Sequence, residues 1–368
     1  MPYQPNELLS SHFKNQGIDL SKLDEQLKLV APDSPNLPLY RDMMLTVLRM
    51  AHDDSNRWNA KITLQALREL DHAFRTLEQY KGRRKVTVFG SARTPVEHPM
   101  YALARELGAT LARSNLMVIT GAGGGIMAAA HEGAGVDHSL GFNITLPFEQ
   151  HANPTVDGTD KLLPFHFFFI RKLFFVKEAD ALVLCPGGFG TLDEALEVLT
   201  LIQTGKSPIV PIILLDRPNG HYWETWRRFV VNDLLDQKLI SPSDLNLFKV
   251  THDIDAAMAE ILQFYRNFHS YRWVQDRMVI RVNQRLTDAA MEQLNKDFDA
   301  LLVSDKITQT SALPEEVDDA HLAHFYRIVL IPHRRDFGTI RLLIDAINNA
   351  DTESERAPLA DVATTQHM

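Results

Sequence analysis

The stretch ALVLCPGGFGTLDE, residues 181–194, decides the fold that we expect for this chain. Its first five residues form a continuous apolar run, which is typical of a strand buried on both faces of a parallel sheet. A glycine-rich turn follows, and the apolar periodicity beyond it predicts a helix over 191–204. A strand that ends in a glycine turn and opens a helix is the beginning of a βαβ unit.

The same alternation of strands and helices extends on both sides of this stretch. Further apolar runs occur at 86–90, 116–120, 141–147 and 209–216, and stretches of helix length occur at 97–113, 125–135, 166–178 and 222–236. This alternation predicts an α/β fold with a Rossmann-like, doubly wound parallel sheet. Such sheets bind ligands at the carboxyl ends of their strands.

The chain divides into four predicted parts. We expect an N-terminal helical extension at 1–84, a Rossmann-like nucleotide-binding domain at 85–270, a small α+β module at 271–350 and a disordered tail at 351–368. In the module, the pattern predicts strands at 278–282 and 325–332, helices at 286–301 and 338–349, and a loop at 311–320.

Composition excludes several classes of protein. The 368 residues carry a net charge of −9, which argues against a protein whose main task is to bind nucleic-acid phosphates. A single cysteine, Cys185, rules out an internal disulfide and a CxxC metal site, and we expect no metal and no cofactor. The N-terminus lacks the pattern of a signal peptide, and no apolar run is long enough to span a membrane. We therefore expect a cytoplasmic protein.

Two glycine-rich turns predict an anion site. TGAGGGIM (120–127) and PGGFGT (186–191) each follow a predicted strand and open a helix, whose N-terminus offers free N–H groups and a positive dipole end. The dinucleotide fingerprint would need a glycine at Ile126 and an acid near Asn143, and no G-K-[ST] follows either turn. A mononucleotide or a sugar phosphate therefore fits better than NAD or ATP hydrolysis.

Arg171 and Glu194 are the ionisable residues that the predicted topology brings to the same edge of the sheet. An arginine in the nearly apolar helix 166–178 is costly unless it meets an anion. Glu194, at 100° per residue, points roughly opposite the apolar face of its helix. Two structural interpretations remain open: Thr191 and Glu194 also form a T-x-x-E capping box, and Arg171 also suits an ordinary salt bridge.

These residues resemble a known family. PGGFGTLDE (186–194) resembles the P-G-G-x-G-T-x-x-E motif of the LOG (Lonely guy) family, nucleoside 5′-monophosphate phosphoribohydrolases that are often labelled lysine decarboxylases. Arg171 and Lys172 resemble the R-K pair of that family, and VFGSAR (88–93) and GAGGGIM (121–127) resemble its two earlier loops. The resemblance covers about residues 40–268 and is closest to the longer bacterial members.

The resemblance implies an activity and a set of site residues. The activity is hydrolysis of the N-glycosidic bond of a nucleoside 5′-monophosphate, AMP-like or a cytokinin riboside monophosphate, by Arg171 and Glu194. The implied substrate-binding residues are Ser91, Gly124, Gly125, Met127, Lys172, Gly187, Gly188, Phe189, Gly190 and Thr191. Ala128 and His131 depart from the family, because many relatives carry an acid and an amide there in G-I-M-E-A-A-N. That departure concerns contacts with the base or the ribose more than the chemistry.

The long N-terminal helices and the α/β core predict a homo-oligomer, and the resemblance implies a homodimer or a higher homo-oligomer. From the net charge and the short apolar runs we expect no nucleic-acid or membrane partner. The main alternative is a non-catalytic protein that binds or senses a nucleotide or a phosphate-bearing cofactor, such as a molybdenum cofactor. A decarboxylase dependent on pyridoxal phosphate is a third interpretation, but no cofactor signature accompanies Lys172 or Lys177.

Overall fold

The structure, a computed structural model, describes residues 11–13, 19–53, 56–146 and 151–354. The chain forms two compact units, residues 1–68 and 69–368, which we describe separately. The first unit is helical, as predicted for the N-terminus: it contains α2 (Ser21–Val30), α3 (Leu37–His52) and the beginning of α4 (Arg57–Glu78). Phe13, Leu20 and Leu45 form its small core.

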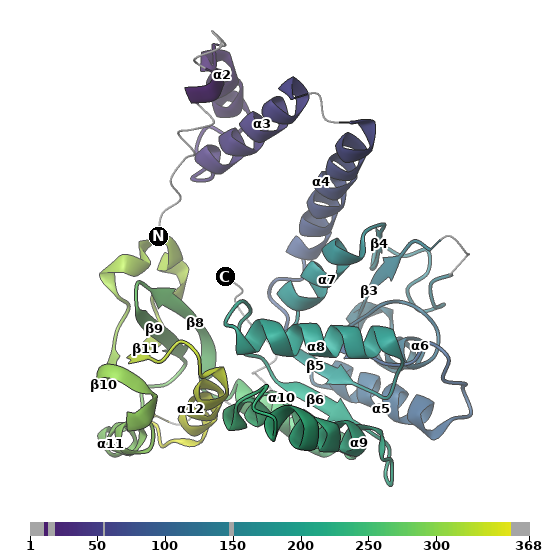
Figure 1. Cartoon of the computed structure of the whole chain (residues 1–368), viewed down its shortest axis with the longest axis vertical. Coiled ribbons are helices and arrows are strands. Elements are labelled where there is room, and N and C mark those ends of the chain that lie inside the picture. Colours follow the sequence, from purple (N-terminus) through teal and green to yellow (C-terminus); the bar gives the residue numbers. More distant parts are fainter. Residues whose placement is uncertain (1–10, 14–18, 54–55, 147–150, 355–368) are drawn as a thin grey trace. The chain divides into compact units, whose positions relative to one another are not determined.

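The second unit contains a seven-stranded sheet in which every neighbouring pair of strands is parallel (Figure 1). The strand order is β4-β3-β2-β1-β5-β6-β7. The strands are β1 (Lys85–Phe89), β2 (Met117–Thr120), β3 (Ser139–Ile144), β4 (Leu162–Phe165), β5 (Ala181–Leu184), β6 (Ile212–Leu215) and β7 (Lys249–Thr251). The chain therefore builds outward from β1 in one direction and resumes on its other side at β5, which makes the β1–β5 boundary the topological switch point.

Helices cover both faces of this sheet, which confirms the predicted doubly wound α/β fold. They are α5 (Pro99–Arg113), α6 (Ile126–Ala134), α7 (Phe168–Lys177), α8 (Phe189–Gln203), α9 (Tyr222–Phe229) and α10 (Ile254–Phe264). Residues of α5, α6 and α10 join alternate strand residues such as Val86 and Val88 in one core. On the opposite face Phe175 of α7 packs against Phe89 and Phe142, with ring centroids 4.9 and 5.3 Å apart.

A second, four-stranded antiparallel sheet follows, in the order β10-β11-β9-β8 (green to yellow in Figure 1). Its elements are β8 (Phe268–Val274), β9 (Arg277–Val282), α11 (Asp288–Asp297), β10 (Leu302–Thr310), β11 (Tyr326–Pro332) and α12 (Phe337–Asn349). An ion network lies in its interior, where Glu316 accepts hydrogen bonds from Arg281 and Arg327 at 2.7 and 2.9 Å. All three side chains are at most 1% exposed.

The structure differs from the prediction at several elements. Strands β4, β7, β8 and β10 are not predicted: β4 contains Pro164, which argues against a strand, and β7, β8 and β10 interrupt their apolar residues with polar ones. The expected helix 222–236 changes from α-helix to a π-helical turn at Val230–Leu235, and the expected loop 311–320 contains a 3₁₀ helix, Pro314–Leu322. Three more short 3₁₀ helices are Val136–His138, Pro242–Leu247 and Asp299–Leu301.

The predicted part boundaries at 84 and 270 stay predictions. Helix α4 ends at Glu78, and β8 begins the second sheet at Phe268. Most of the expected disordered tail, residues 355–368, lies outside the described residues. Within the described portion, Thr352 forms a β-bridge with Leu286.

Candidate functional site

A cavity of about 320 Å³ opens at the carboxyl ends of β1 and β5, next to the topological switch point. Both glycine turns and the first turn of α7 contribute to its wall. Its lining residues are Phe89, Gly90, Ser91, Ala92, Arg93, Gly121, Met127, Ile144, Leu146, Phe168, Arg171, Phe175, Gly188, Gly190, Thr191, Asp193 and Glu194. The sequence-predicted pair Arg171 and Glu194 therefore faces one cavity, together with part of the predicted binding set.

Ser91 joins the two glycine turns. Its N–H donates to the carbonyl of Pro186 at 3.2 Å, and its carbonyl accepts from the N–H of Ile126 at 3.0 Å. Gly125 permits this contact because its φ is +58° and a Cβ there would lie 2.2 Å from the Ser91 oxygen. Ser91 and Met127 line the cavity, whereas Gly124, which is exposed, and Gly125 do not.

The second glycine turn forms the N-terminus of α8. The helix begins at Phe189 with Gly188 as its N-cap, so its free N–H groups and positive dipole end lie at the cavity. Gly188, Gly190 and Thr191 line the cavity, but Phe189 is 94% exposed and is not in its lining. Gly187 is packed against Thr191, since a Cβ on Gly187 would lie 2.1 Å from Thr191 Oγ1.

Arg171 extends from α7 between two aromatic rings. Its guanidinium carbon lies 5.0 Å from the ring centroid of Phe168 and 5.4 Å from that of Phe175. Burial lowers the pKa of Arg171, while the negative charges of Glu194 and Asp193 raise it. Its buried Nε has no hydrogen-bond partner among the described residues.

Glu194 is buried in the wall of the cavity, whereas Arg171 is half-buried. The residue is 4% exposed, and its Oε2 finds no hydrogen-bond partner in the described parts of the chain. Burial raises the pKa of Glu194 to about 7, although the charges of Lys172 and Arg171 act to lower it. A carboxyl group with this pKa exchanges its proton near neutral pH, as a catalytic acid or base does.

Two sequence interpretations of Glu194 are wrong. The capping box does not form, because α8 begins two residues before Thr191 and no side chain caps it. Glu194 also does not point away from the packed side of α8: it is buried with Thr191 and Val198, whereas the apolar Leu196 is 47% exposed. Ala195 and Ile202 of the predicted apolar face are buried as expected, so the packed face of α8 is shifted around the helix to include Glu194.

Lys172 bridges α7 and α8 instead of lining the cavity. Its Nζ lies 2.8 Å from a carboxylate oxygen of Asp193 and 2.6 Å from one of Glu197. These two ion pairs connect α7, which carries Arg171, to α8, which carries Glu194. Asp193 precedes Glu194 in the chain and Glu197 follows it.

The two residues that depart from the family are not part of the cavity wall. His131 is fully buried and Ala128 is partly buried, and neither lines the cavity. Sequence reasoning did not single out Arg93, Asp193 or Phe168 as lining residues. Arg93 and Asp193 lie inside motifs that were recognised, whereas no local signal marks Phe168.

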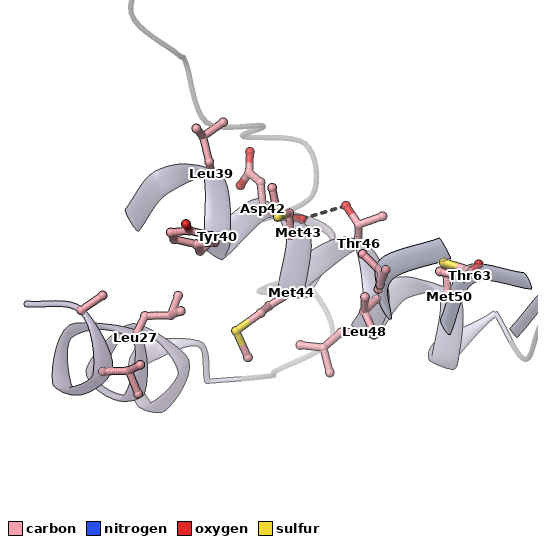
Figure 2. Close-up of a pocket in the computed structure, with 14 residues that line it drawn as sticks. Leu27, Leu39, Tyr40, Asp42, Met43, Met44, Thr46, Leu48, Met50 and Thr63 are labelled. Carbon is pink, nitrogen blue, oxygen red and sulfur yellow. Dashed lines mark hydrogen bonds between the residues drawn. The ribbon is translucent and has the colours of Figure 1, made fainter. Parts of the chain in front are cut away.

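A larger cleft of about 1020 Å³ lies in the first unit, among α2, α3 and α4 (Figure 2). Its wall is almost entirely apolar, with Met43, Met44 and Leu48 among the exposed side chains. The hydroxyl of Thr46 donates to the Asp42 carbonyl at 2.8 Å, a bond internal to α3. No group of three or more metal-ligating side chains occurs in the described residues. The smaller cavity is therefore the candidate site, because ionisable side chains converge there.

The chain is similar to several known proteins. A family model described as "Possible lysine decarboxylase" matches residues 124–261. A pyrimidine/purine nucleotide 5′-monophosphate nucleosidase from Escherichia coli (strain K12) is 30% identical over 144 residues, which cover 36% of this chain and 32% of that protein. The match thus spans about a third of that relative's length. A cytokinin riboside 5′-monophosphate phosphoribohydrolase from Arabidopsis thaliana is 30% identical over 171 residues, which cover 44% of this chain and 73% of that protein.

Among solved structures, the molybdenum cofactor carrier protein from Chlamydomonas reinhardtii is 22% identical, with a TM-score of 0.35 over 49% of this chain and 97% of that one.

None of the helices in the described ranges has both the length and the apolar character that a bilayer crossing requires.

Proposed function

The chain belongs to the LOG (Lonely guy) family, and we propose that it hydrolyses the N-glycosidic bond of nucleoside 5′-monophosphates. The products are the free base and ribose 5-phosphate. Named relatives are a nucleotide 5′-monophosphate nucleosidase and a cytokinin riboside 5′-monophosphate phosphoribohydrolase, which supports this reaction class.

One observation carries the proposal. Arg171 and Glu194 face the same cavity, and each has a buried polar atom without a hydrogen-bond partner among the described residues. A buried polar group that has left water without a new partner costs free energy, so such groups are rare unless a ligand satisfies them. A suitable ligand has an anionic part, which the Arg171 guanidinium can bind, and a part that becomes cationic during the reaction, which the Glu194 carboxylate can stabilise.

The reaction follows from that arrangement. The N-terminus of α8, with Gly188, Gly190 and Thr191, holds the 5′-phosphate and positions the ribose. Breaking the bond between C1′ and the base nitrogen builds positive charge on the ribose, which the Glu194 carboxylate stabilises. Water supplies the new oxygen on C1′, and its proton ends on the departing base. Arg171 binds substrate oxygens and favours the ionised form of Glu194.

The test is a panel of nucleoside monophosphates incubated with the purified protein, with chromatography of the free base. Nucleosides without phosphate should be poor substrates, because they lose the binding energy of the phosphate cradle. Glu194→Gln keeps the size of the side chain and should retain nucleotide binding while losing about 10²-fold or more in rate. Unchanged turnover of AMP by Glu194→Gln would contradict the assignment, and tight binding with no turnover by the natural protein would favour a carrier or sensor.

The state of the protein in the cell is also part of the proposal. A homo-oligomer in the cytoplasm fits the single cysteine and the exposed apolar side chains of the first unit, such as Tyr40, Met43 and Val47. Light scattering on the purified chain measures the oligomeric state. A monomer at all concentrations would contradict the proposed homo-oligomer.

A further inference from the structure

A buried polar cluster lies directly behind the first glycine turn. It contains His131 of α6, Thr120 at the end of β2, and Asn153, which follows β3; these residues are 0, 0 and 4% exposed. His131 Nδ1 lies 3.2 Å from Asn153 Nδ2, and His131 Nε2 lies 3.2 Å from both Thr120 Oγ1 and the Leu140 carbonyl. Side chains from three segments thus meet at one histidine.

The partners determine the orientation of each group. Asn153 Nδ2 also lies 3.3 Å from the carbonyl of Gly123, and a carbonyl can only accept, so the amide nitrogen faces both Gly123 and His131. His131 Nδ1 must then accept, and Nε2 carries the proton that it donates towards the Leu140 carbonyl. Burial lowers the pKa of His131 to about 4, which agrees with a neutral ring.

The cluster holds a strained residue in the turn. Ala122 has φ of +59°, the left-handed region that residues with a Cβ rarely adopt. Its carbonyl accepts from the main-chain N–H of Asn153 at 2.7 Å, and its N–H donates to Thr120 Oγ1 at 2.9 Å. The cluster side chains contact both ends of this arrangement: His131 Nε2 lies 3.2 Å from Thr120 Oγ1, and the Asn153 side-chain amide lies 3.3 Å from the carbonyl of Gly123, the next residue.

The strained residue adjoins the candidate site. Gly121, immediately before Ala122, lines the cavity. A Cβ on Gly121 would lie 3.8 Å from Arg171 Nη1 and 2.9 Å from the sulfur of Met127. A shift of the turn at Ala122 therefore moves the cavity wall beside Arg171.

We propose that the side chains of His131 and Asn153 are positioning residues: through Thr120 and the Gly123 carbonyl, on either side of Ala122, they hold Ala122 in its left-handed conformation and so place the first glycine turn against Arg171. This inference rests on the proposed function for its effect on catalysis. It also gives the departure at position 131 a role, because a histidine here orients the Asn153 amide, which reaches the turn.

The experiment compares His131→Ala and Asn153→Ala, each alone and combined with Ala122→Gly. Glycine adopts positive φ without strain, so the turn of an Ala122→Gly variant no longer needs the cluster. Each single alanine variant at His131 or Asn153 should lower kcat/KM for AMP by about tenfold or more, because small misplacements of a site are costly. Hydrogen exchange of the peptide covering 118–127 should become faster by a similar factor. Ala122→Gly should restore both quantities in either background, and alone it should change them little.

The controls separate this inference from the proposed function. His131→Gln keeps a hydrogen-bond acceptor and a donor, so its kcat/KM and its exchange rate should fall between those of the natural protein and those of His131→Ala. If the His131 variants do not fold, Asn153→Ala still tests the inference. The inference is overturned if the alanine variants fold and keep the natural exchange rate and kcat/KM. It is also overturned if Ala122→Gly does not rescue them, because His131 would then serve only to pack the core. A natural protein that hydrolyses no nucleotide, but whose exchange pattern follows the expectation, contradicts the proposed function and leaves this inference standing.

Discussion

Glu194 and Arg171 each have a buried polar atom that remains available to a ligand. Each leaves water without gaining a hydrogen-bond partner for one buried atom among the described residues. Lys172, by contrast, satisfies its charge with Asp193 and Glu197. The resemblance groups Arg171 and Lys172 as a pair, but the structure gives them different surroundings: Arg171 lines the cavity and Lys172 connects two helices.

The pKa of Glu194 sets a prediction for pH. Burial raises this pKa from 4.5 to about 7, so the carboxyl is protonated below about pH 7 and ionises as the pH rises. If the carboxylate stabilises the cationic ribose, kcat/KM for AMP rises with pH through about 7. A profile that is flat from pH 5.5 to 8.5 would contradict this role. The stability effect has the opposite sign: the native state holds the proton more tightly than the unfolded chain, so stability falls as pH rises from about 4.5 to about 7.

Two variants serve as controls for that profile, because the phosphate of the substrate also titrates near pH ~6. Glu194→Gln should remove the rise near pH 7 from the residual activity and the corresponding loss of stability. Lys172→Met should move the rise to higher pH, because Lys172 is the charge that lowers the pKa of Glu194 most. A profile of Lys172→Met identical to the natural one would show that another group titrates.

At the scale of elements, the two glycine turns contain glycines of two kinds. Gly125 and Gly187 permit close packing of the chain, since a Cβ on either would overlap a neighbouring atom. Gly188 and Gly190 line the cavity, and a Cβ on either would meet no heavy atom within 4 Å. The second kind leaves room for a ligand at the start of α8.

This difference predicts opposite effects of alanine at Gly187 and Gly190. Gly190→Ala should fold with unchanged or slightly higher stability, because alanine favours the helix, but should raise the KM for AMP about tenfold by filling the cradle. Gly187→Ala should lose about 1–3 kcal/mol of stability, because the new Cβ would lie 2.1 Å from Thr191 Oγ1. Urea unfolding and steady-state kinetics measure the two effects. Equal loss of stability in both variants would contradict the distinction.

At the scale of the whole molecule, the second unit contains an all-parallel sheet with an apolar core and an antiparallel sheet whose interior also holds buried charges. The interior of the antiparallel sheet contains the Arg281–Glu316–Arg327 ion network, in which all three charges are buried. Burial raises the pKa of Glu316, but hydrogen bonds from Arg327, Leu313 and Arg281 outweigh burial and leave the pKa below its usual value. Removal of the carboxylate would leave two buried guanidinium groups without their shared partner.

Glu316→Ala should therefore destabilise the protein by about 3–5 kcal/mol, as expected when one partner of a buried ion network is removed. Because the native pKa is lowered, the stability from Glu316 is present above about pH 4.5 and is lost as the pH falls below it. Chemical unfolding of the natural protein and Glu316→Ala at pH 7 and at pH 4 measures both effects. A stability difference that is the same at the two pH values would contradict this account.

Local sequence was sufficient for the features that depend on near neighbours in the chain. The apolar runs before PGGFGT and TGAGGGIM predicted buried parallel strands, because a strand covered on both faces needs apolar residues at every position. The same logic placed Arg171 and Glu194 at one edge of the sheet, since the direction of each helix follows from that of its strand. Strand β4 contains Pro164, which argues against a strand, and β7 has only three residues, so neither gives a strand pattern.

Only the tertiary structure decided which side chains line the cavity and which lie behind it. Glu194 is buried and its Oε2 unpartnered among the described residues because of what packs around α8, and Phe168 reaches the cavity because α7 meets the glycine turns. The contact between His131 and Asn153 joins residues that are 22 positions apart. Such contacts depend on where separate elements meet in space, and neither composition nor periodicity contains that information.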